Sequence, residues 1–211
     1  MASSIIHMAV ANEINKVLKR DNDKLLIGSI APDISKQVGQ TKLHSHFLDN
    51  NDTNIPNMDR FLEKYKDKLD DDFVMGYYIH LLTDYFWFKN FIPEIYENNL
   101  IKKLDGKVVN CKGNMAIMYI YNDYTNLNIQ VIDEYHLDFK IFYNEIPKID
   151  FIIEEIPMDK LSIILNKVEK IIEDSKETKE LVFNLDNIIN FINLSVKLVL
   201  SNLQDLGVVY D

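Results

Sequence analysis

Apolar residues recur at helical spacing at the beginning of the chain. One set of them stands three or four positions apart and would form one face of a helix. These residues are Ile5, Met8, Ala11, Ile14 and Leu18. Ser3 or Ser4 precedes this face, and either side chain can cap a helix N-terminus. The pattern predicts a first helix from residue 3 or 4 to about residue 20.

The apolar segment that follows ends at Pro32. Because proline disfavours a helical residue before it, Asp33 is expected to begin a new segment. Residues 40–57 are rich in Asn, Asp, Thr and His, a composition typical of a loop. Asn57 then suits the N-cap of a helix over residues 58–69.

A strongly apolar helix is predicted in the middle of the chain, over residues 73–88. The acidic run at residues 70–72 suits the positive end of its dipole. Because the helix is apolar nearly all round, it is expected in the centre of a bundle. Residues 102–114 contain Gly106 and Gly113 and should form a connection with a short hairpin.

The second half of the chain predicts three more helices, over residues 114–135, 159–173 and 185–206. Residues 146–157 hold two prolines and alternate in polarity, which fits a loop or a short strand. No shift in composition marks a domain boundary, and no internal repeat is visible. The pattern therefore predicts an all-α protein, with one single-domain helical bundle over residues 1–211.

Composition supports this prediction and narrows the function. Only 6 glycines and 5 prolines occur, which favours long helices over a many-stranded β fold. The formal net charge of −10 repels polyanions, so broad nucleic-acid binding is not expected. A phosphodiester substrate stays compatible with that charge, because a bound divalent cation can reverse the local potential.

The cysteine count and the apolar segments bear on the compartment. Cys111 is the only cysteine, which excludes an internal disulfide and a zinc site built from cysteines. Residues 1–10 lack the basic start and long apolar run of a signal peptide. No stretch reaches the ~20 apolar residues that span a bilayer. We expect a cytoplasmic protein without a transmembrane segment.

His80 and Asp84 carry the most informative chemistry. They are four positions apart on the predicted central helix, so both side chains project from one face. Imidazole nitrogen and carboxylate oxygen are both ligands that zinc accepts. Gly76 lies one turn earlier on that face, where glycine costs about 1 kcal/mol relative to alanine. We expect that the glycine leaves room for a metal ion or for another helix.

The polar residues also have simpler interpretations. His80 and Asp84 can form a hydrogen-bonded pair without a metal ion. His7 can cap or pack near the first helix, and Asp33 can be a turn or N-cap residue. The other histidines lie in polar segments, where exposed histidines are common. They are His44, His46 and His136.

Four motifs taken together, in their order, resemble the zinc-dependent phospholipase C family, to which single-strand-specific zinc nucleases are related. The motifs are His7-Met8-Ala9, Gly28-Ser29-Ile30-Ala31-Pro32-Asp33, Ser45-His46-Phe47, and the segment from Gly76 through His80 to Asp84. The resemblance covers roughly residues 5–90. Beyond that range only Tyr121-Asn122-Asp123-Tyr124 is similar.

The resemblance implies an all-α fold that uses zinc to cleave phosphodiesters. It implies one zinc site, whose ligands would be Asp33, His46, His80 and Asp84. Asp84 would bridge to a second zinc ion that His7 also binds. Asp33 would lie beside the metal-bound water and help to deprotonate or orient it. His46 is chosen over His44 because the family's loop histidine stands in a Ser-His-Phe context.

The sequence departs from the family at two places. Secreted members begin with a tryptophan whose amino and carbonyl groups bind zinc, whereas this chain begins Met1-Ala2-Ser3, so that ligand is expected to be absent. A third zinc ion normally takes two further histidines and a glutamate after the central helix. Here no histidine follows until His136. We therefore expect one or two zinc ions, with another divalent metal as the alternative.

The sequence thus predicts a metal-dependent hydrolase that acts on a small phosphate ester or a phospholipid headgroup. One alternative is a single-strand-specific nuclease, although the acidic charge and the lack of a basic aromatic stripe count against it. The other is a non-catalytic metal-binding or interaction protein with a partly lost zinc cluster.

Overall fold

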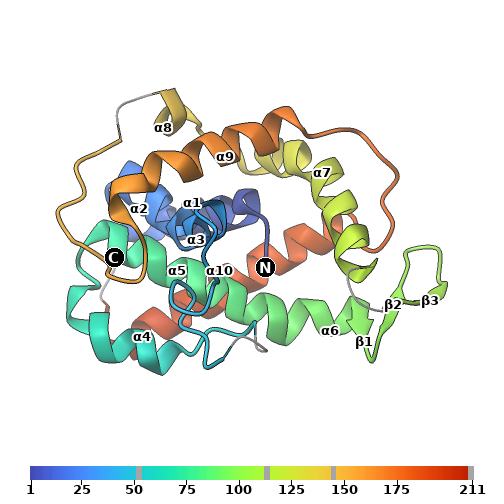
Figure 1. The fold of residues 1–211 in the computed structure, drawn as a ribbon, viewed down its shortest axis with the longest axis horizontal. Coiled ribbons are helices and arrows are strands. Elements are labelled where there is room, and N and C mark those ends of the chain that lie inside the picture. The colour runs from blue at the N-terminus through green and yellow to red at the C-terminus, as the bar shows by residue number, and fades with distance from the viewer. Residues whose placement is uncertain (51–53, 112–114, 144–145, 209–211) are drawn as a thin grey trace.

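The computed structural model describes residues 1–50, 54–111, 115–143 and 146–208 and shows a mostly helical protein (Figure 1). The prediction of an all-α fold is confirmed. The helices are α1 (Ser4–Leu18), α2 (Asn22–Ile30), α3 (Ile34–Gln37), α4 (Met58–Tyr65), α5 (Asp72–Phe86), α6 (Ile92–Ile95), α7 (Met115–Tyr135), α8 (Lys140–Tyr143), α9 (Leu161–Glu173) and α10 (Leu185–Asp205). The single-domain organisation stays a prediction.

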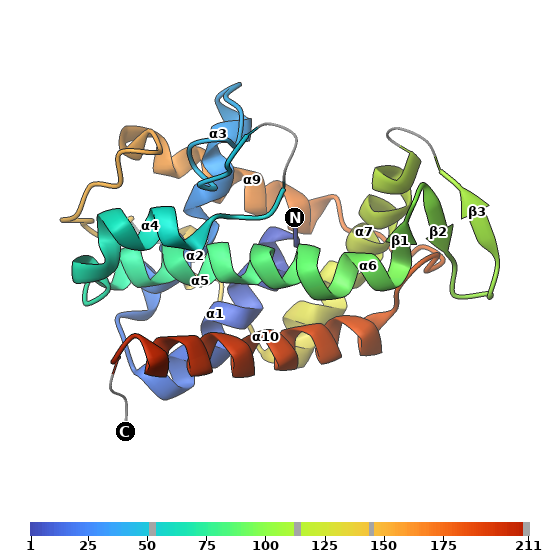
Figure 2. The ribbon, with the colours of Figure 1, turned by 90° about the horizontal axis from the view of Figure 1, so that it is seen from below.

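Helix α5 lies in the centre of the bundle, as its apolar sequence predicts. It packs against α1, α2, α4 and α10, and Figure 2 shows α4 and α10 on opposite sides of it. Every residue from Phe73 to Asp84 is buried. The Asp71 carboxylate caps the helix by accepting hydrogen bonds from the backbone of Phe73 and Val74. This helix therefore carries His80 and Asp84 into the interior.

Two glycines allow α2 and α5 to cross at close range. A Cβ atom on Gly76 would lie 2.1 Å from the carbonyl oxygen of Leu25, and one on Gly28 would lie 2.2 Å from that of Phe73. Both distances are far below van der Waals contact, so only glycine fits. Of the two reasons expected for Gly76, the close approach of another helix is the one that the structure supports.

The chain from α1 to α3 is more continuous than its sequence predicts. The Ser3 hydroxyl caps α1, which ends at Leu18 instead of near residue 20. After α2, a 3-10 turn (η1, Ala31–Asp33) leads directly into α3. The expected break at Pro32 is wrong. Proline has no backbone N–H, but in the first turn of a helix that group forms no helical hydrogen bond, so Pro32 fits at the start of η1.

The remaining predictions hold with small shifts at the ends of elements. Helix α4 starts after Asn57, and a 3-10 turn, η2 (Lys66–Lys68), extends it. A π-helical turn, η3 (Trp87–Phe91), follows α5. A further 3-10 turn, η4 (Met158–Lys160), precedes α9. The expected hairpin forms within a three-stranded antiparallel sheet. Its strands are β1 (Tyr96–Glu97), β2 (Leu100–Lys102) and β3 (Val108–Asn110).

Two predicted loops are irregular over the parts that the structure describes. Residues 146–157 contain no strand, and residues 40–57 form no regular helix in their described part. Residues 51–53 of that loop, and residues 112–114 at the end of the hairpin connection, lie outside the described residues. Among the helices of the described segments, none combines the length and the apolar character needed to cross a membrane.

Candidate metal centre

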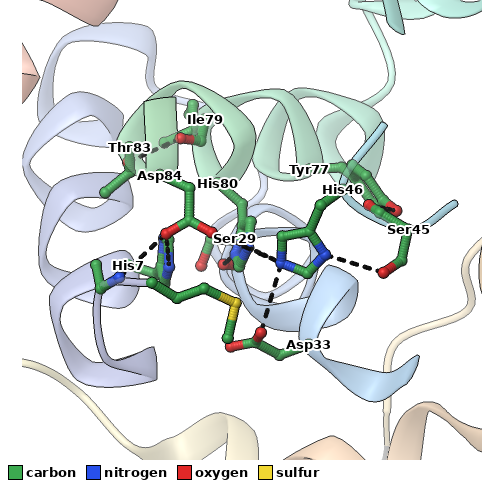
Figure 3. Close-up of polar contacts among 12 residues, drawn as sticks. His7, Ser29, Asp33, Ser45, His46, Tyr77, Ile79, His80, Thr83 and Asp84 are labelled. Atoms are coloured by element: carbon green, nitrogen blue, oxygen red, sulfur yellow. Dashed lines mark hydrogen bonds and ion pairs between the residues drawn. The ribbon is translucent and has the colours of Figure 1, made fainter. Parts of the chain in front are cut away.

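Four elements bring the five predicted site residues together in the interior (Figure 3). Helix α1 supplies His7, and η1 supplies Asp33. The loop before α4 supplies His46, and α5 supplies His80 and Asp84. None of the five is more than 7% exposed to solvent. Buried polar groups need partners, so a cluster of this kind requires a compensating interaction.

The first group is centred on His46. Its Nε2 atom lies 3.3 Å from Nε2 of His80, 3.6 Å from Oδ1 of Asp33 and 3.6 Å from Oδ2 of Asp84. The Asp84 oxygen in turn lies 3.7 Å from Nε2 of His80. Four ligand atoms in tetrahedral coordination around zinc stand about 3.3–3.6 Å apart. The separations around Nε2 of His46 lie in that range, and Asp33, His46 and His80 each offer one ligand atom within 4.8 Å of the others, so these three residues can hold one zinc ion.

Hydrogen bonds on the far sides of the two rings orient them. Nδ1 of His80 lies 2.7 Å from the carbonyl oxygen of Ser29. Because a carbonyl only accepts, Nδ1 carries the proton and Nε2 of a neutral ring presents its lone pair to the cluster. Nδ1 of His46 contacts the Ser45 hydroxyl at 2.9 Å, and the Tyr77 hydroxyl donates to the Ser45 carbonyl. Outer contacts of this kind typically hold metal-binding histidines.

Two carboxylate oxygens of the first group have no hydrogen bond. They are Oδ1 of Asp33 and Oδ2 of Asp84, and both are buried and without a hydrogen-bond partner within the described segments. An unpaired buried carboxylate oxygen is costly, because it has lost water without gaining a donor. A divalent cation between these oxygens and the two imidazoles satisfies all of them. The residues present therefore fit zinc.

His7 and Asp84 belong to a second group that shares residues with the first. Nε2 of His7 lies 3.4 Å from Oδ1 of Asp84, the carboxylate oxygen that faces away from His46. The His7 ring stacks on that of His80, with 3.7 Å between ring centroids. Neither nitrogen of His7 has a hydrogen-bond partner among the residues described. Ligand atoms of His7, His80 and Asp84 lie close enough together to hold a metal ion.

Burial sets the charge of these groups. It lowers the pKa of His46 below its usual value and that of His80 well below, so both rings are neutral at neutral pH. Burial alone would raise the pKa of Asp33 and Asp84, but contacts with the neighbouring histidines outweigh it and keep both values low. Neutral imidazoles and ionised carboxylates are the forms that bind metals.

The backbone of the first two residues also reaches the cluster, a contact that no sequence pattern predicts. The Ala2 N–H donates to Oδ1 of Asp84 at 3.0 Å, and the Tyr124 hydroxyl donates to the Met1 carbonyl at 2.6 Å. In this structure burial lowers the pKa of the Met1 amino group to about 5, so the group is uncharged at neutral pH. Tyr124 belongs to the one similar segment recognised beyond residue 90.

Two histidines stay outside the cluster. His44 and His136 are both exposed, in agreement with the simpler interpretation of these residues. Within the described parts of the chain, the His, Cys, Asp and Glu side chains form two groups suited to a metal ion, both made from the five predicted residues. A third group corresponding to the family's third zinc ion is not present among these residues.

A cavity of about 400 Å³ lies against the cluster. Asp33 lines it, together with the first four residues of the chain. Polar and apolar side chains from α3, α7 and α9 complete its wall. The first metal group therefore has one ligand that borders a space large enough for a small organic molecule.

A helical bundle with a buried cluster of histidine and aspartate ligands beside a cavity is typical of a metal-binding protein. The sequence profile described as zinc-dependent phospholipase C matches residues 6–193, nearly the whole chain. The chain belongs to the zinc-dependent phospholipase C family, and zinc is the cofactor that its histidine and aspartate groups are positioned to hold. No curated protein and no solved structure matches the chain significantly.

Proposed function

We propose that this protein is a metal-dependent hydrolase of phosphodiesters or phosphate esters. In this proposal one zinc site is formed by Asp33, His46, His80 and Asp84, and a second by His7 with Asp84. The observation that carries it is the position of Asp33. Its carboxylate has an unpaired buried oxygen that faces the cluster, and the same residue lines the adjoining cavity. A substrate in that cavity would therefore meet the metal group.

The residues have separate roles in this mechanism. Bound zinc supplies a Lewis acid and lowers the pKa of water toward ~7, which makes hydroxide available at neutral pH. His46 and His80 hold their Nε2 lone pairs toward the metal position. Asp84 links the two groups through its two oxygens. Asp33 orients the attacking water and accepts its proton.

The cavity restricts the substrate in size. Its volume of about 400 Å³ falls at the small end of the range for ligand pockets. A small soluble phosphate ester or a phospholipid headgroup fits that space. The net charge of −10 disfavours the alternative of a single-strand-specific nuclease. Cytoplasmic location stays a prediction from the sequence.

A non-catalytic role is the second candidate, and one observation favours it. If Asp84 joins Asp33, His46 and His80 around one ion, the first group has four protein ligands, and structural zinc sites are closed by four ligands. A catalytic site keeps a position for water or substrate. In the hydrolase proposal, water or substrate would take the place of Asp33 at the first ion, at the edge of the cavity, or would bind the second zinc ion.

Hydrolysis assays on the zinc-loaded protein test the proposal. Suitable substrates are bis-p-nitrophenyl phosphate, phosphatidylcholine vesicles, and single-stranded DNA and RNA. We expect zinc-dependent cleavage of the small ester, and a loss of at least about 100-fold in His80→Ala. His44→Ala is the matched control, because His44 is exposed two positions from His46. Bound zinc without cleavage of any substrate would favour the non-catalytic role, and cleavage of nucleic acid alone would favour the nuclease.

A further inference from the structure

The cavity beside the metal group is built from single faces of two helices. The α7 residues that line it are three or four positions apart, as are those of α9. They are Tyr121, Tyr124, Thr125 and Asn128 on α7, and Ile164, Lys167 and Ile171 on α9, with Asp174 at the C-cap of α9. Lys36 and Gln37 of α3 close the space on the side of Asp33. The cavity is therefore a defined space between packed helices.

The charged side chains of this wall are two lysines, Lys36 and Lys167, and two aspartates, Asp33 and Asp174. Lys36 follows Asp33 by about one helical turn, and Lys167 lies on the facing helix α9, which packs against α3. Neither ammonium group forms an ion pair within the part of the chain that the structure describes. Of the two aspartates in the wall, Asp174 is paired with Lys170 at 3.4 Å, and Asp33 belongs to the metal group. Two free cations thus face a cavity in a protein whose net charge is −10.

Apolar and aromatic side chains make up the rest of the wall. Ile164 is buried, and Ile171 packs on the same face of α9. The rings of Tyr121 and Tyr124 lie 5.8 Å apart across one turn of α7. These side chains can contact a short carbon chain that joins two charged groups.

We propose that this cavity holds the non-leaving substituent of the substrate, and that this substituent carries a second negative charge bound between Lys36 and Lys167. The inference rests on the proposed hydrolase function. The scissile phosphate lies at the Asp33 side, where the metal group is, and the second anion lies toward α9. Two unpaired cations attract an anionic substituent and repel a quaternary ammonium group of the same shape.

Three 4-nitrophenyl phosphodiesters of similar shape test this assignment. Their second substituents are 2-sulfoethyl, 3,3-dimethylbutyl and 2-(trimethylammonio)ethyl, which are anionic, neutral and cationic. In each case water attacks phosphorus, the bond from phosphorus to the phenolic oxygen breaks, and 4-nitrophenolate leaves. We expect kcat/KM to fall in the order anionic, neutral, cationic, with about 10-fold between the first and the last. An equal or reversed order overturns the proposal.

Lysine substitutions locate the effect. Lys36→Gln and Lys167→Gln should each raise KM for the sulfoethyl ester about 3- to 5-fold, and the double variant about 10-fold. KM for the neutral ester should stay the same in all three variants. Lys197→Gln removes the same charge from an exposed position on α10 and is the matched control. Equal changes for both esters, or a change in the control, overturn the assignment to the cavity.

A binding measurement distinguishes a failure of this inference from a failure of the proposed function. Calorimetry with 2-sulfoethylphosphonate and 3,3-dimethylbutylphosphonate needs no turnover by the zinc-loaded protein. Tighter binding of the sulfonate, lost in the double variant, supports the cavity even if all three esters resist hydrolysis and the hydrolase proposal fails. Absence of that preference overturns the inference while leaving hydrolysis intact.

The anionic substituent can come from a soluble ester or from a phospholipid headgroup. Vesicles of phosphatidylserine, whose headgroup carries a carboxylate beside its ammonium group, supply the lipid source in the same assay, and vesicles of phosphatidylcholine, whose headgroup lacks the carboxylate, are the comparison. Preferential cleavage of phosphatidylserine assigns the cavity to a lipid headgroup. Cleavage of the sulfoethyl ester with neither lipid cleaved assigns it to a soluble ester, and both results support an anionic ligand.

Discussion

Nδ1 of His80 is hydrogen-bonded to the carbonyl oxygen of Ser29 at 2.7 Å, so a metal-binding ring on α5 is fixed by the backbone of α2. The contact depends on how closely the two helices approach. They meet at Gly28 and Gly76, where neither position has space for a Cβ atom. Glycine at the crossing and the orientation of the histidine one turn later are therefore parts of one arrangement.

Gly76→Ala should separate these helices and disturb the metal group. The added methyl carbon would lie 2.1 Å from the Leu25 carbonyl oxygen and 2.9 Å from the Ser29 nitrogen, so α2 must move. We expect the free energy of unfolding to fall by about 2–3 kcal/mol, as for an overpacked core. Differential scanning calorimetry measures this as a drop in Tm of about 4–12 °C.

Gly39→Ala provides the comparison for this variant. Gly39 has open space around its Cβ position but a φ of +75°, so alanine there should cost only about 1–2 kcal/mol of backbone strain. Zinc content should fall in Gly76→Ala and stay unchanged in Gly39→Ala. Full zinc content together with unchanged stability in Gly76→Ala would contradict the link between the crossing and the site.

The shared carboxylate predicts how many ions each variant loses. Asp84 presents Oδ2 to His46 and Oδ1 to His7, so Asp84→Asn should lose every ion that the protein binds. His7→Ala removes a ligand of the second group alone and should keep one ion. Elemental analysis of each purified variant after dialysis against zinc counts them. If His7→Ala and the unaltered protein hold the same number, the second group binds no ion of its own.

Metal removal should destabilise the fold, because the cluster joins α1, η1, the loop before α4 and α5. Binding to the folded state alone contributes about 4 kcal/mol when the free metal concentration is about 1,000 times Kd. Adding a chelator should therefore lower Tm by about 8–16 °C, and zinc should restore it. The exposed variant His44→Ala should respond as the unaltered protein does. A Tm that stays the same when chelator is added would mean that the cluster holds no stabilising ion.

The sequence predicts the helices and the pair His80 and Asp84 because these signals are local, whereas His7, Asp33 and His46 follow only from the order of motifs that resembles the family. His80 and Asp84 share a helix face through their spacing alone, and Gly76 marks a close approach within the same turn. The orienting carbonyl of Ser29 has no such signal, because every residue carries a carbonyl group. The same holds for the Ala2 N–H that bonds to Asp84. Backbone partners of this kind depend on how distant segments pack.

The cavity could not be predicted from the sequence for a related reason. Lys36 and Lys167 are separated by most of the chain and become neighbours of one space only because α3 packs on α9. Lys167 lies on an amphipathic helix whose sequence predicts a solvated lysine. The acidic net charge also does not predict two lysines at this cavity, since net charge carries no information on where the charges lie.

Asp123 belongs to the segment Tyr121–Tyr124, which resembles the family, and its contacts indicate a structural role. Its buried carboxylate accepts backbone hydrogen bonds from Leu181, Val182 and Phe183 at 2.8, 2.7 and 3.0 Å. These bonds tie the segment before α10 to α7, outside the metal cluster.

Asp123→Asn halves the acceptor capacity of this side chain and removes its charge. We therefore expect a loss of about 3 kcal/mol in the free energy of unfolding, measured by urea denaturation. Zinc content should be unchanged, and the exposed Asp133→Asn on the same helix should change neither quantity. Loss of zinc in Asp123→Asn without loss of stability would instead place this residue in the function of the site.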